Sequence, residues 1–551
     1  MDRASPLQLS TLAAAVSLLV IPLMWRLAPR LGLVDLPGPR KVHKVPVPRV
    51  GGWGITIGSL VPLLLWLKFD PPLVSFVVGI LILFGFGIWD DLRNIGHWSK
   101  FLGQLLSAGV VVYYGDLYVA RLPFLDGVTL NAAVGKPLTM FALIGVINAI
   151  NHSDGLDGLA AGESMLSLIG LAILGYLADS VAVMSVALAM MGGILGFLRY
   201  NSHPARVFMG DAGSQVLGFA LGFLTVYLTQ RADTALSAAL PLLLLGVPVA
   251  DILIVLCKRI RARVNWFRAS RNHAHHRLLD LGFAHYQTVI IIYSIHAALV
   301  FAAVILRYES DLRVTATYLA LMIALFGGLI VAERRGWRAL IHHARGSDGI
   351  ISASGRLKTI RLLRELPQHL ISLAAPALML LGSMWVAQVP REIGVVAAVF
   401  SALLAVELWL ARARPLRTRV VRVTMYVAAI ASAYLIVSYP GHAAERAVEV
   451  GTIAVVAALV VAIGAYVRFA DDAKFETTPT DFLIIFALLV LIVLAGIDAS
   501  AGSRALVEVV VYAVVLLYSC EVLIGRTVQR WNGFNMAALA ALAVMAVRGL
   551  L

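Results

Sequence analysis

Long apolar runs, separated by short polar connections, recur along almost the whole chain. A membrane-spanning helix needs about 20 mostly apolar residues, and most of the runs approach that length. Because lipid offers no water partners, each run is expected to form a helix that satisfies its own backbone hydrogen bonds. The pattern predicts spans at residues 7–28, 51–67, 73–89, 101–115, 134–151, 163–178, 181–198, 212–229, 236–257, 287–306 and 314–332.

The predicted fold class is therefore an all-α, polytopic integral membrane helix bundle. About 11 transmembrane helices form its first part, and about seven more are expected between residues 367 and 549. Three regions follow from this pattern: a first membrane domain at 1–332, a basic cytoplasmic linker at 333–366 and a second membrane domain, of unknown function, at 367–551. With only Arg3 before it, the first apolar run is expected to be a retained helix rather than a signal peptide.

Composition supports a membrane protein. Of 551 residues, 60% are hydrophobic and 14% are charged, which excludes an ordinary soluble globular chain. No connection is long enough for a soluble catalytic domain, so any chemistry must lie in loops, at helix ends or inside the bundle. Cys257 and Cys520 lie in or beside apolar segments and suggest neither a disulfide framework nor a thiolate metal site.

Basic residues give the chain a formal net charge of +14, and they gather in short connections next to apolar runs. This distribution follows the positive-inside rule of membrane proteins, so no nucleic-acid partner is expected. Alternation of the predicted helices places the loops after the first, third, fifth, seventh and ninth on one face. Since the loops after the first and ninth helices are rich in lysine and arginine, that face is predicted to be cytoplasmic.

An acidic pair, Asp90 and Asp91, ends the third apolar run. These carboxylates stand at the negative end of a helix dipole, so a cation is expected to offset them. Solvated turn residues are the plain alternative for such a pair. Mg²⁺ is the attractive partner because it prefers carboxylate oxygens and usually bridges to substrate phosphates.

A second group of polar residues closes the fifth apolar run, in the string NAINHSDGLDGLAAG. If the helix continues, its members at spacings of three share one face, and the interleaved glycines allow a ligand to approach the backbone closely. A purely structural role is the less favoured alternative. The residues are Asn148, Asn151, Asp154 and Asp157.

The string NSHPARVFMGDAGS lies between the seventh and eighth runs. Asp211 stands just before a predicted helix N-terminus, where an N-cap is its plain structural role. A glycine on either side favours a ligand instead. Phe208 has two readings as well, as a packing residue or as a platform for a nucleobase.

Three histidines, His273, His275 and His276, precede Arg277 in the loop after the ninth run. Such imidazoles can bind zinc or phosphate or take part in acid–base chemistry. The interpretation as a zinc site is weakened because the sequence has neither a nearby cysteine nor a helical i, i+4 histidine pair. The arginine-rich surroundings favour a pyrophosphate, and surface histidines remain the plain alternative. Together, the four strings collect carboxylates for a divalent cation and cations for phosphates, which is what phosphoryl transfer requires.

In this order, the strings resemble those of the polyprenyl-phosphate N-acetylhexosamine-1-phosphate transferases, within glycosyltransferase family 4. The resemblance runs from about residue 1 to 350 and includes KVHKVPVPRVGG, the DD pair, NxxNxxDGLDGLA, PARVFMGDAGS and HAHHRLLDLGF. It implies a phosphotransferase that moves GlcNAc 1-phosphate, or a related N-acetylhexosamine 1-phosphate, from its UDP sugar to undecaprenyl phosphate. UMP is the by-product, and the lipid-linked sugar pyrophosphate starts synthesis of a cell-envelope polysaccharide such as lipopolysaccharide O-antigen.

The resemblance also assigns roles to individual residues. Asp90, Asp91 and Asp211 are the implied catalytic residues, with Mg²⁺ or alternatively Mn²⁺ held by Asp211, Asp91 and Asp154. Whether the lipid phosphate attacks directly, oriented by Asp90, or an aspartate attacks first in a two-step scheme is left open. A bacterial inner-membrane location, a cytoplasmic active site and a homodimer are also implied. The substrate-binding residues are Lys44, Lys100, Asn148, Asn151, Asp154, Asp157, Phe208, His273, His275, His276 and Arg277.

Two departures from the family pattern bear on sugar preference: His152-Ser153 stands where an apolar pair is common, and Ser270 where an acidic residue is common. A transporter or flippase is the main rival function, since intramembrane polar residues also mark translocation paths. A transporter would place its charges near the bilayer midplane, whereas these strings gather on one face. A structural scaffold gives no reason for the DD, DGLDG and GD strings in one chain.

Overall fold

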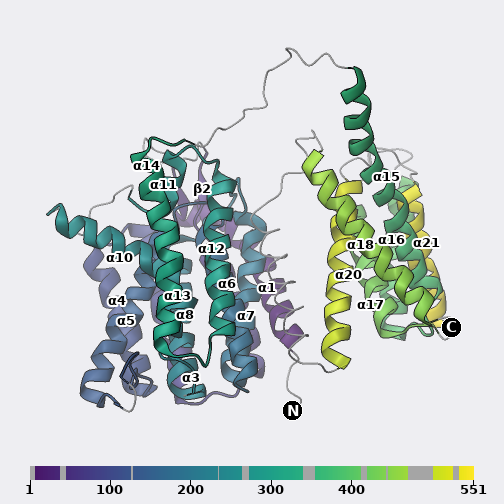
Figure 1. The fold of residues 1–551 in the computed structure, drawn as a ribbon. Coiled ribbons are helices and arrows are strands. Elements are labelled where there is room, and N and C mark those ends of the chain that lie inside the picture. Colours follow the sequence, from purple (N-terminus) through teal and green to yellow (C-terminus); the bar gives the residue numbers. More distant parts are fainter. Residues whose placement is uncertain are drawn as a thin grey trace. The chain divides into compact units, whose positions relative to one another are not determined.

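The computed structural model describes residues 6–37, 45–125, 128–233, 235–263, 272–338, 354–410, 418–441, 445–469, 501–524 and 533–551, and helices dominate it (Figure 1). The chain forms two compact units, the first containing the described residues up to 338 and the second those from 354 onward. Part of the predicted linker at 333–366 is helical, because a helix begins at Ser354. The three-part functional division stays a prediction.

Helices make up most of the described part of the first unit, and the predicted fold class is confirmed. Three helices end or bend in π-helical turns, labelled η. The elements are α1 (Pro6–Leu31), α2 (Gly51–Trp66), α3 (Pro71–Arg93), α4 (His97–Gly109), η1 (Val110–Tyr114), α5 (Ala132–Ser153), α6 (Leu159–Leu177), α7 (Val181–Asn201), α8 (Gly210–Tyr227), η2 (Leu228–Ala232), α9 (Leu240–Leu244), α10 (Gly246–Arg261), α11 (Ala274–Asp280), α12 (His285–Ile305), α13 (Asp311–Met322), η3 (Ile323–Gly327) and α14 (Gly328–Arg334).

Each predicted span corresponds to one of these helices or to a continuous series of two or three helical elements, with one exception. The run at 236–257, predicted as a single span, is broken between α9 and α10. Pro248 has no N–H to donate to the carbonyl of Leu244, so an unbroken helix cannot pass this point without losing a hydrogen bond. Among the described residues, 12 helices are long and apolar enough to cross a bilayer.

Helix α8 is the centre of the first unit. Its apolar stretch is wholly buried by protein, and it packs against α2, α3, α5 and α6. Glycines make this close packing possible, as they do at many membrane helix interfaces. A Cβ atom on Gly218 would lie 2.6 Å from the Cα of Ile147 on α5, and one on Gly52 would lie 2.4 Å from the backbone nitrogen of Gly213.

A short hairpin of β1 (Val34–Asp35) and β2 (Val47–Pro48) is the exception to the all-helical fold. The amide of Phe208 donates to the Pro48 carbonyl at 2.8 Å, and the amide of Gly51 donates to the Phe208 carbonyl at 2.9 Å. The hairpin therefore fixes the loop that leads into α8. An ion pair between Arg49 and Asp35 closes the base of the hairpin.

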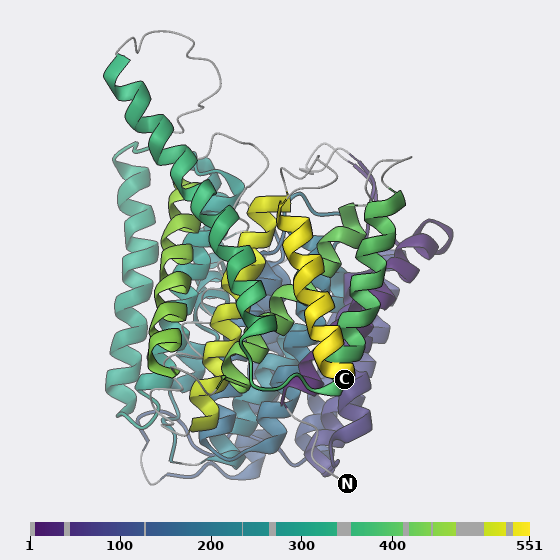
Figure 2. The ribbon, with the colours of Figure 1, turned by 90° about the vertical axis from the view of Figure 1, so that its right-hand side faces the viewer.

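The second unit is a separate helix bundle with its own apolar core, and α21 packs beside α15 and α16 (Figure 2). About seven runs were predicted in this extension; the structure describes six helices, and residues 470–500 lie outside the described residues. The described helices are α15 (Ser354–Met384), α16 (Arg391–Leu410), α17 (Thr418–Ser438), α18 (Glu445–Phe469), α20 (Ala501–Ile524) and α21 (Gly533–Leu550).

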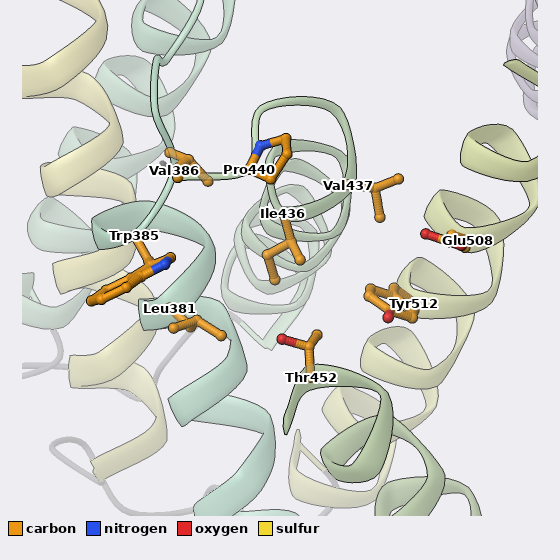
Figure 3. Close-up of a pocket in the computed structure, with 10 residues that line it drawn as sticks. Leu381, Trp385, Val386, Ile436, Val437, Pro440, Thr452, Glu508 and Tyr512 are labelled. Atoms are coloured by element: carbon orange, nitrogen blue, oxygen red, sulfur yellow. The ribbon is translucent and has the colours of Figure 1, made fainter. Parts of the chain in front are cut away.

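This second unit contains a cavity of about 360 Å³ between α15, α17, α18 and α20 (Figure 3). Its walls are mostly apolar, with an indole from Trp385 and oxygen-bearing side chains from Thr452, Glu508 and Tyr512. All of its lining residues belong to the second unit, and the sequence analysis singled out none of them.

Helix α3 offers a test of the packing around α8. A Cβ on Gly87 would lie 2.4 Å from the Cα of Ala212 in α8, whereas a Cβ on Gly85 meets nothing within 4 Å. We expect Gly87→Ala to destabilise the protein by about 1 to 3 kcal/mol through overpacking, and Gly85→Ala to leave it nearly unchanged. The apparent melting temperature in detergent measures both. Equal melting temperatures for the two variants would contradict the close α3–α8 contact.

Candidate functional site

The centre of the candidate site is a lysine between two carboxylates. Lys100, in the first turn of α4, lies 2.8 Å from Oδ2 of Asp90 at the end of α3, and it also pairs with Asp211 at the start of α8. Asn151, near the end of α5, donates to Oδ1 of Asp211 at 3.0 Å and to the Ser214 hydroxyl at 2.8 Å. Four helix ends thus bring together residues from three of the four strings noted in the sequence.

Asp91 has a different position from that of Asp90. Its two carboxylate oxygens accept the backbone N–H groups of Asp211 and Ala212, at 3.0 and 3.2 Å. These are among the first amides of α8, which have no partner within their own helix. Asp91 therefore caps α8 from the neighbouring helix, and its negative charge lies at the positive end of the α8 dipole.

This geometry corrects one interpretation of the sequence. The N-cap role considered for Asp211 is wrong, because Asp211 lies inside the first turn of α8. The neighbouring glycines have a packing role, and the ligand that they were taken to favour stays a prediction: Gly210 has a φ of 71°, and a Cβ there would lie 2.5 Å from Oδ2 of Asp91. Gly213 packs against Gly52 of α2. Both glycines let the helices approach closely enough for the cap to form.

Hard oxygen donors for a divalent cation are available at this centre. Oδ1 of Asp90 is buried and has no hydrogen-bond partner among the described residues, and the carboxylate of Asp211 lies on the other side of Lys100. Asn151 adds an amide oxygen, since its nitrogen makes the two hydrogen bonds. Asp91 is committed to the α8 amides instead. Asp154 is exposed and ends α5, so its metal role stays a prediction.

The polar stripe predicted from the NAINHSDGLDG string does not form, because α5 ends at Ser153. Asn148 points into the bundle, where it donates to Gln104 of α4 at 2.8 Å, and Gln104 in turn lies 3.2 Å from Gln215 of α8. This amide network holds α4, α5 and α8 together. Asn148 therefore has a structural role in the bundle, and its substrate-binding role stays a prediction.

Asp157 lies beyond α5, in the turn before α6. Its carboxylate accepts the amide of Ala205 at 3.0 Å and lies 2.7 Å from Nδ1 of His203, both in the loop before α8. Burial alone would raise the pKa of Asp157, but these hydrogen bonds outweigh it and lower the pKa. Asp157 therefore remains a carboxylate and fastens the α7–α8 loop to the α5–α6 turn.

Two of the predicted histidines lie buried beside α10 and α5. His273 places Nδ1 2.7 Å from Oδ2 of Asp251 in α10, so its neutral form carries the proton on Nδ1 and leaves Nε2 as the acceptor. His275 packs on Gly155, where a Cβ would lie 2.3 Å from Nε2. Burial lowers the pKa of His275 to about 3, so this imidazole is neutral at physiological pH. The ring of His276 lies beside it in a tilted contact, with ring centroids 4.3 Å apart.

Arg277 is paired within the protein. Its guanidinium donates twice to Glu333 at the end of α14, from Nε at 2.7 Å and from Nη2 at 2.9 Å, while its side chain is buried. Such a two-pronged pair holds both partners in a fixed orientation. An adjoining open cavity of about 380 Å³ is lined by Lys258 and Arg338 as well as Arg277. Those two cations belong to the basic connections that the sequence marked.

Two further residues were predicted to bind substrate, Lys44 and Phe208. Lys44 lies outside the described residues. Phe208 is half-buried and held through its backbone by the β-hairpin, so a nucleobase role for its ring stays a prediction. All of the placed strings lie at one end of the first unit, where α11, α14 and β2 are labelled in Figure 1.

Sequence reasoning missed the partners that position the predicted residues. Asp251 could have been found, because an acidic residue within an apolar run is costly and calls for a partner. Gln104 offers the same signal more weakly. Glu333 carries no such signal, since it lies at a helix end among charged residues. His203 was inside a marked string but was passed over. The sequence analysis did not include Asp251, Glu333, Gln104, Gln215, His203 and His285.

The sequence profile described as glycosyl transferase family 4 matches residues 73–229. A probable undecaprenyl-phosphate N-acetylglucosaminyl 1-phosphate transferase of Bacillus subtilis is 35% identical over 292 residues, which cover 53% of this chain and 82% of the relative. A decaprenyl-phosphate N-acetylglucosaminephosphotransferase of Mycobacterium tuberculosis is 32% identical over 344 residues, or 56% of this chain and 85% of the relative.

A third relative, the undecaprenyl-phosphate alpha-N-acetylglucosaminyl 1-phosphate transferase of Escherichia coli K12, is 28% identical over 290 residues. That similarity covers 52% of this chain and 79% of the relative. In each case, most of the relative corresponds to little more than half of this chain.

The neighbouring aspartates of α3 give a paired test of the site's geometry. Asp91→Asn leaves one acceptor oxygen for two amides and removes a charge from the α8 N-terminus, so we expect a loss of about 1 to 2 kcal/mol in stability. Asp90→Asn keeps the cap, and Lys100 keeps Asp211 as a partner. Its apparent melting temperature should stay near that of the unmodified protein. A larger loss for Asp90→Asn than for Asp91→Asn would refute this division of roles.

Proposed function

Because the chain belongs to the polyprenyl-phosphate N-acetylglucosamine-1-phosphate transferases of glycosyl transferase family 4, we propose that its first unit transfers GlcNAc 1-phosphate from UDP-GlcNAc to undecaprenyl phosphate. The product is a lipid-linked sugar pyrophosphate that starts cell-envelope polysaccharide synthesis, and UMP leaves. The observation that carries the proposal is the Asp90–Lys100–Asp211 cluster, which places a cation between two carboxylates at the ends of apolar helices.

The reaction forms one phosphorus–oxygen bond and breaks another. An oxygen of the lipid phosphate attacks the donor phosphorus that carries the sugar, and the bond from this phosphorus to the oxygen of UMP breaks. A phosphate monoester has a second pKa of about 6, so most of the acceptor is already a dianion at neutral pH. Bringing this dianion to a pyrophosphate donor is mainly a problem of charge neutralisation and positioning.

Lys100 is suited to that problem, because its ammonium group already lies at the meeting point of α3, α4 and α8. We propose that it releases part of its contact with Asp90 or Asp211 to hold the lipid phosphate. Asp90 would orient that phosphate or accept its remaining proton through the buried Oδ1. A two-step scheme, in which an aspartate attacks the donor first, stays open as the alternative.

A divalent cation, Mg²⁺ or alternatively Mn²⁺, fits the oxygen donors of this cluster. Asp90, Asp211 and the amide oxygen of Asn151 would hold it, because hard cations prefer such ligands. When bound, the ion neutralises charge on the donor's phosphates. Asp91 would support it indirectly, by fixing the backbone of α8 at Asp211.

We assign donor recognition to the loops around this cluster. His273 presents Nε2 because Asp251 holds Nδ1, and the neutral His275 packs against the turn that contains Asp154 and Asp157. Phe208 is the proposed surface for the uracil. His276 and Arg277 complete this set, with Arg277 acting from its pair with Glu333. A cytoplasmic orientation, an inner-membrane location and a homodimer belong to the proposal as well, the first supported by the basic connections at this face.

Turnover is tested with the purified chain, Mg²⁺, UDP-GlcNAc and undecaprenyl phosphate. We expect release of UMP and formation of a lipid-linked sugar pyrophosphate. Asp211→Asn should lower turnover by about 100-fold or more, since the cluster loses a charged oxygen ligand. Asp179→Asn, at an exposed turn after α6, is the control and should be unaffected. Absence of turnover with several UDP-amino sugars would overturn the function, and near-normal activity of Asp211→Asn would overturn its role.

Truncation separates the two units. All contacts described for the site lie within the first unit, which ends its last helix at Arg334. A chain ending after residue 338 should therefore keep turnover within about a factor of ten of the full chain, a range in which only modest interactions are lost. UMP release per mole of folded protein is the measurement. A truncated protein that is folded but inactive would show that the second unit takes part in the reaction.

A further inference from the structure

A second group of ligand-like side chains lies apart from the Lys100 cluster. Asp157 in the α5–α6 turn, His203 in the α7–α8 loop and His285 at the start of α12 each offer one ligand atom, and these atoms lie within 4.8 Å of one another. The residues come from three separate segments of the chain. Their convergence is therefore a property of the fold and not of a local turn.

The imidazoles in this group are arranged unusually. The rings of His203 and His285 are stacked, with centroids 4.0 Å apart and planes inclined by 17°. Both ring nitrogens of His285 are buried and have no hydrogen-bond partner among the described residues. A buried polar atom without a partner costs free energy, and an ion is one of the recognised explanations for such a group.

We propose that Asp157, His203 and His285 form a site for a divalent first-row transition metal, with Zn²⁺ as the best fit. Two neutral imidazoles and one carboxylate are borderline ligands of the kind that Zn²⁺ takes, and three protein ligands leave room for a water molecule. This donor set differs from the oxygen-only set around Asp90 and Asp211, which suits Mg²⁺. The two sites are therefore chemically distinct.

The position of the site suggests what the ion does. His203 lies five residues before Phe208, in the loop that leads to Asp211, and the amide of Ala205 already bonds to Asp157. An ion at this point would tie that loop to the α5–α6 turn and to α12. Its proposed role is to hold this loop in place and so to stabilise the fold.

Metal content of the full chain tests the proposal directly. Protein stripped with a chelator is dialysed against Zn²⁺ in excess Mg²⁺, which occupies the oxygen-only site, and bound zinc is measured by mass spectrometry. We expect about one zinc per chain in the unmodified protein. His203→Gln and His285→Gln should each lose it, because glutamine keeps the size but not the imidazole ligand. His369→Gln, an exposed histidine of α15, is the matched control and should keep it.

Two further measurements separate the outcomes. With Co²⁺ in place of Zn²⁺, only the unmodified protein and His369→Gln should show the visible absorption of a low-coordinate site. Zn²⁺ should raise the apparent melting temperature of the same two proteins. His203 is exposed, so His203→Gln is expected to fold even if His285→Gln does not. The proposal would be overturned if the unmodified protein bound no zinc. Unchanged zinc in both variants would overturn it as well, and is the result expected if His273, His275 and His276 bind the ion instead.

Discussion

The cap that Asp91 places on α8 is the contact on which the site depends. A carboxylate of one helix accepts the first free amides of another, so α3 and α8 are joined at their ends as well as along their sides. Gly210 and Gly87 provide the space for this junction. Because Asp90 and Asp211 lie next to this junction, on α3 and α8, the junction also sets the separation of the two carboxylates that Lys100 bridges. The hydrogen bonds that the first amides of α8 need are thus also what positions the Lys100 cluster.

Charge balance accounts for much of the remaining arrangement. Two carboxylates near a membrane surface would repel each other strongly, and Lys100 compensates for only one of the two charges. One negative charge of the cluster is therefore left over, and this charge is the reason for proposing a divalent cation there. Burial keeps His275 neutral, and the carboxylate of Asp251 fixes the ring of His273 through its Nδ1.

Hydropathy predicted the helical fold well, because each bilayer-length run must satisfy its own backbone. It failed at residues 236–257, where Pro248 breaks a run whose hydropathy is continuous. The strings of polar residues predicted the members of the site but not their partners. Sequence does not show which carboxylate meets a helix end, so the cap that Asp91 forms could not be predicted, and its implied metal role stays a prediction. Asp251 and Glu333 were missed because their roles depend on contacts 22 and 56 residues away along the chain.

The bidentate pair between Arg277 and Glu333 has a mechanical consequence. Glu333 is the penultimate residue of α14, from which the chain continues toward the second unit. A displacement of the end of α14 would therefore move the carboxylate that holds Arg277, and with it the short helix that begins beside His273. The pair is thus a tether between the histidine segment and the point where the chain leaves the first unit.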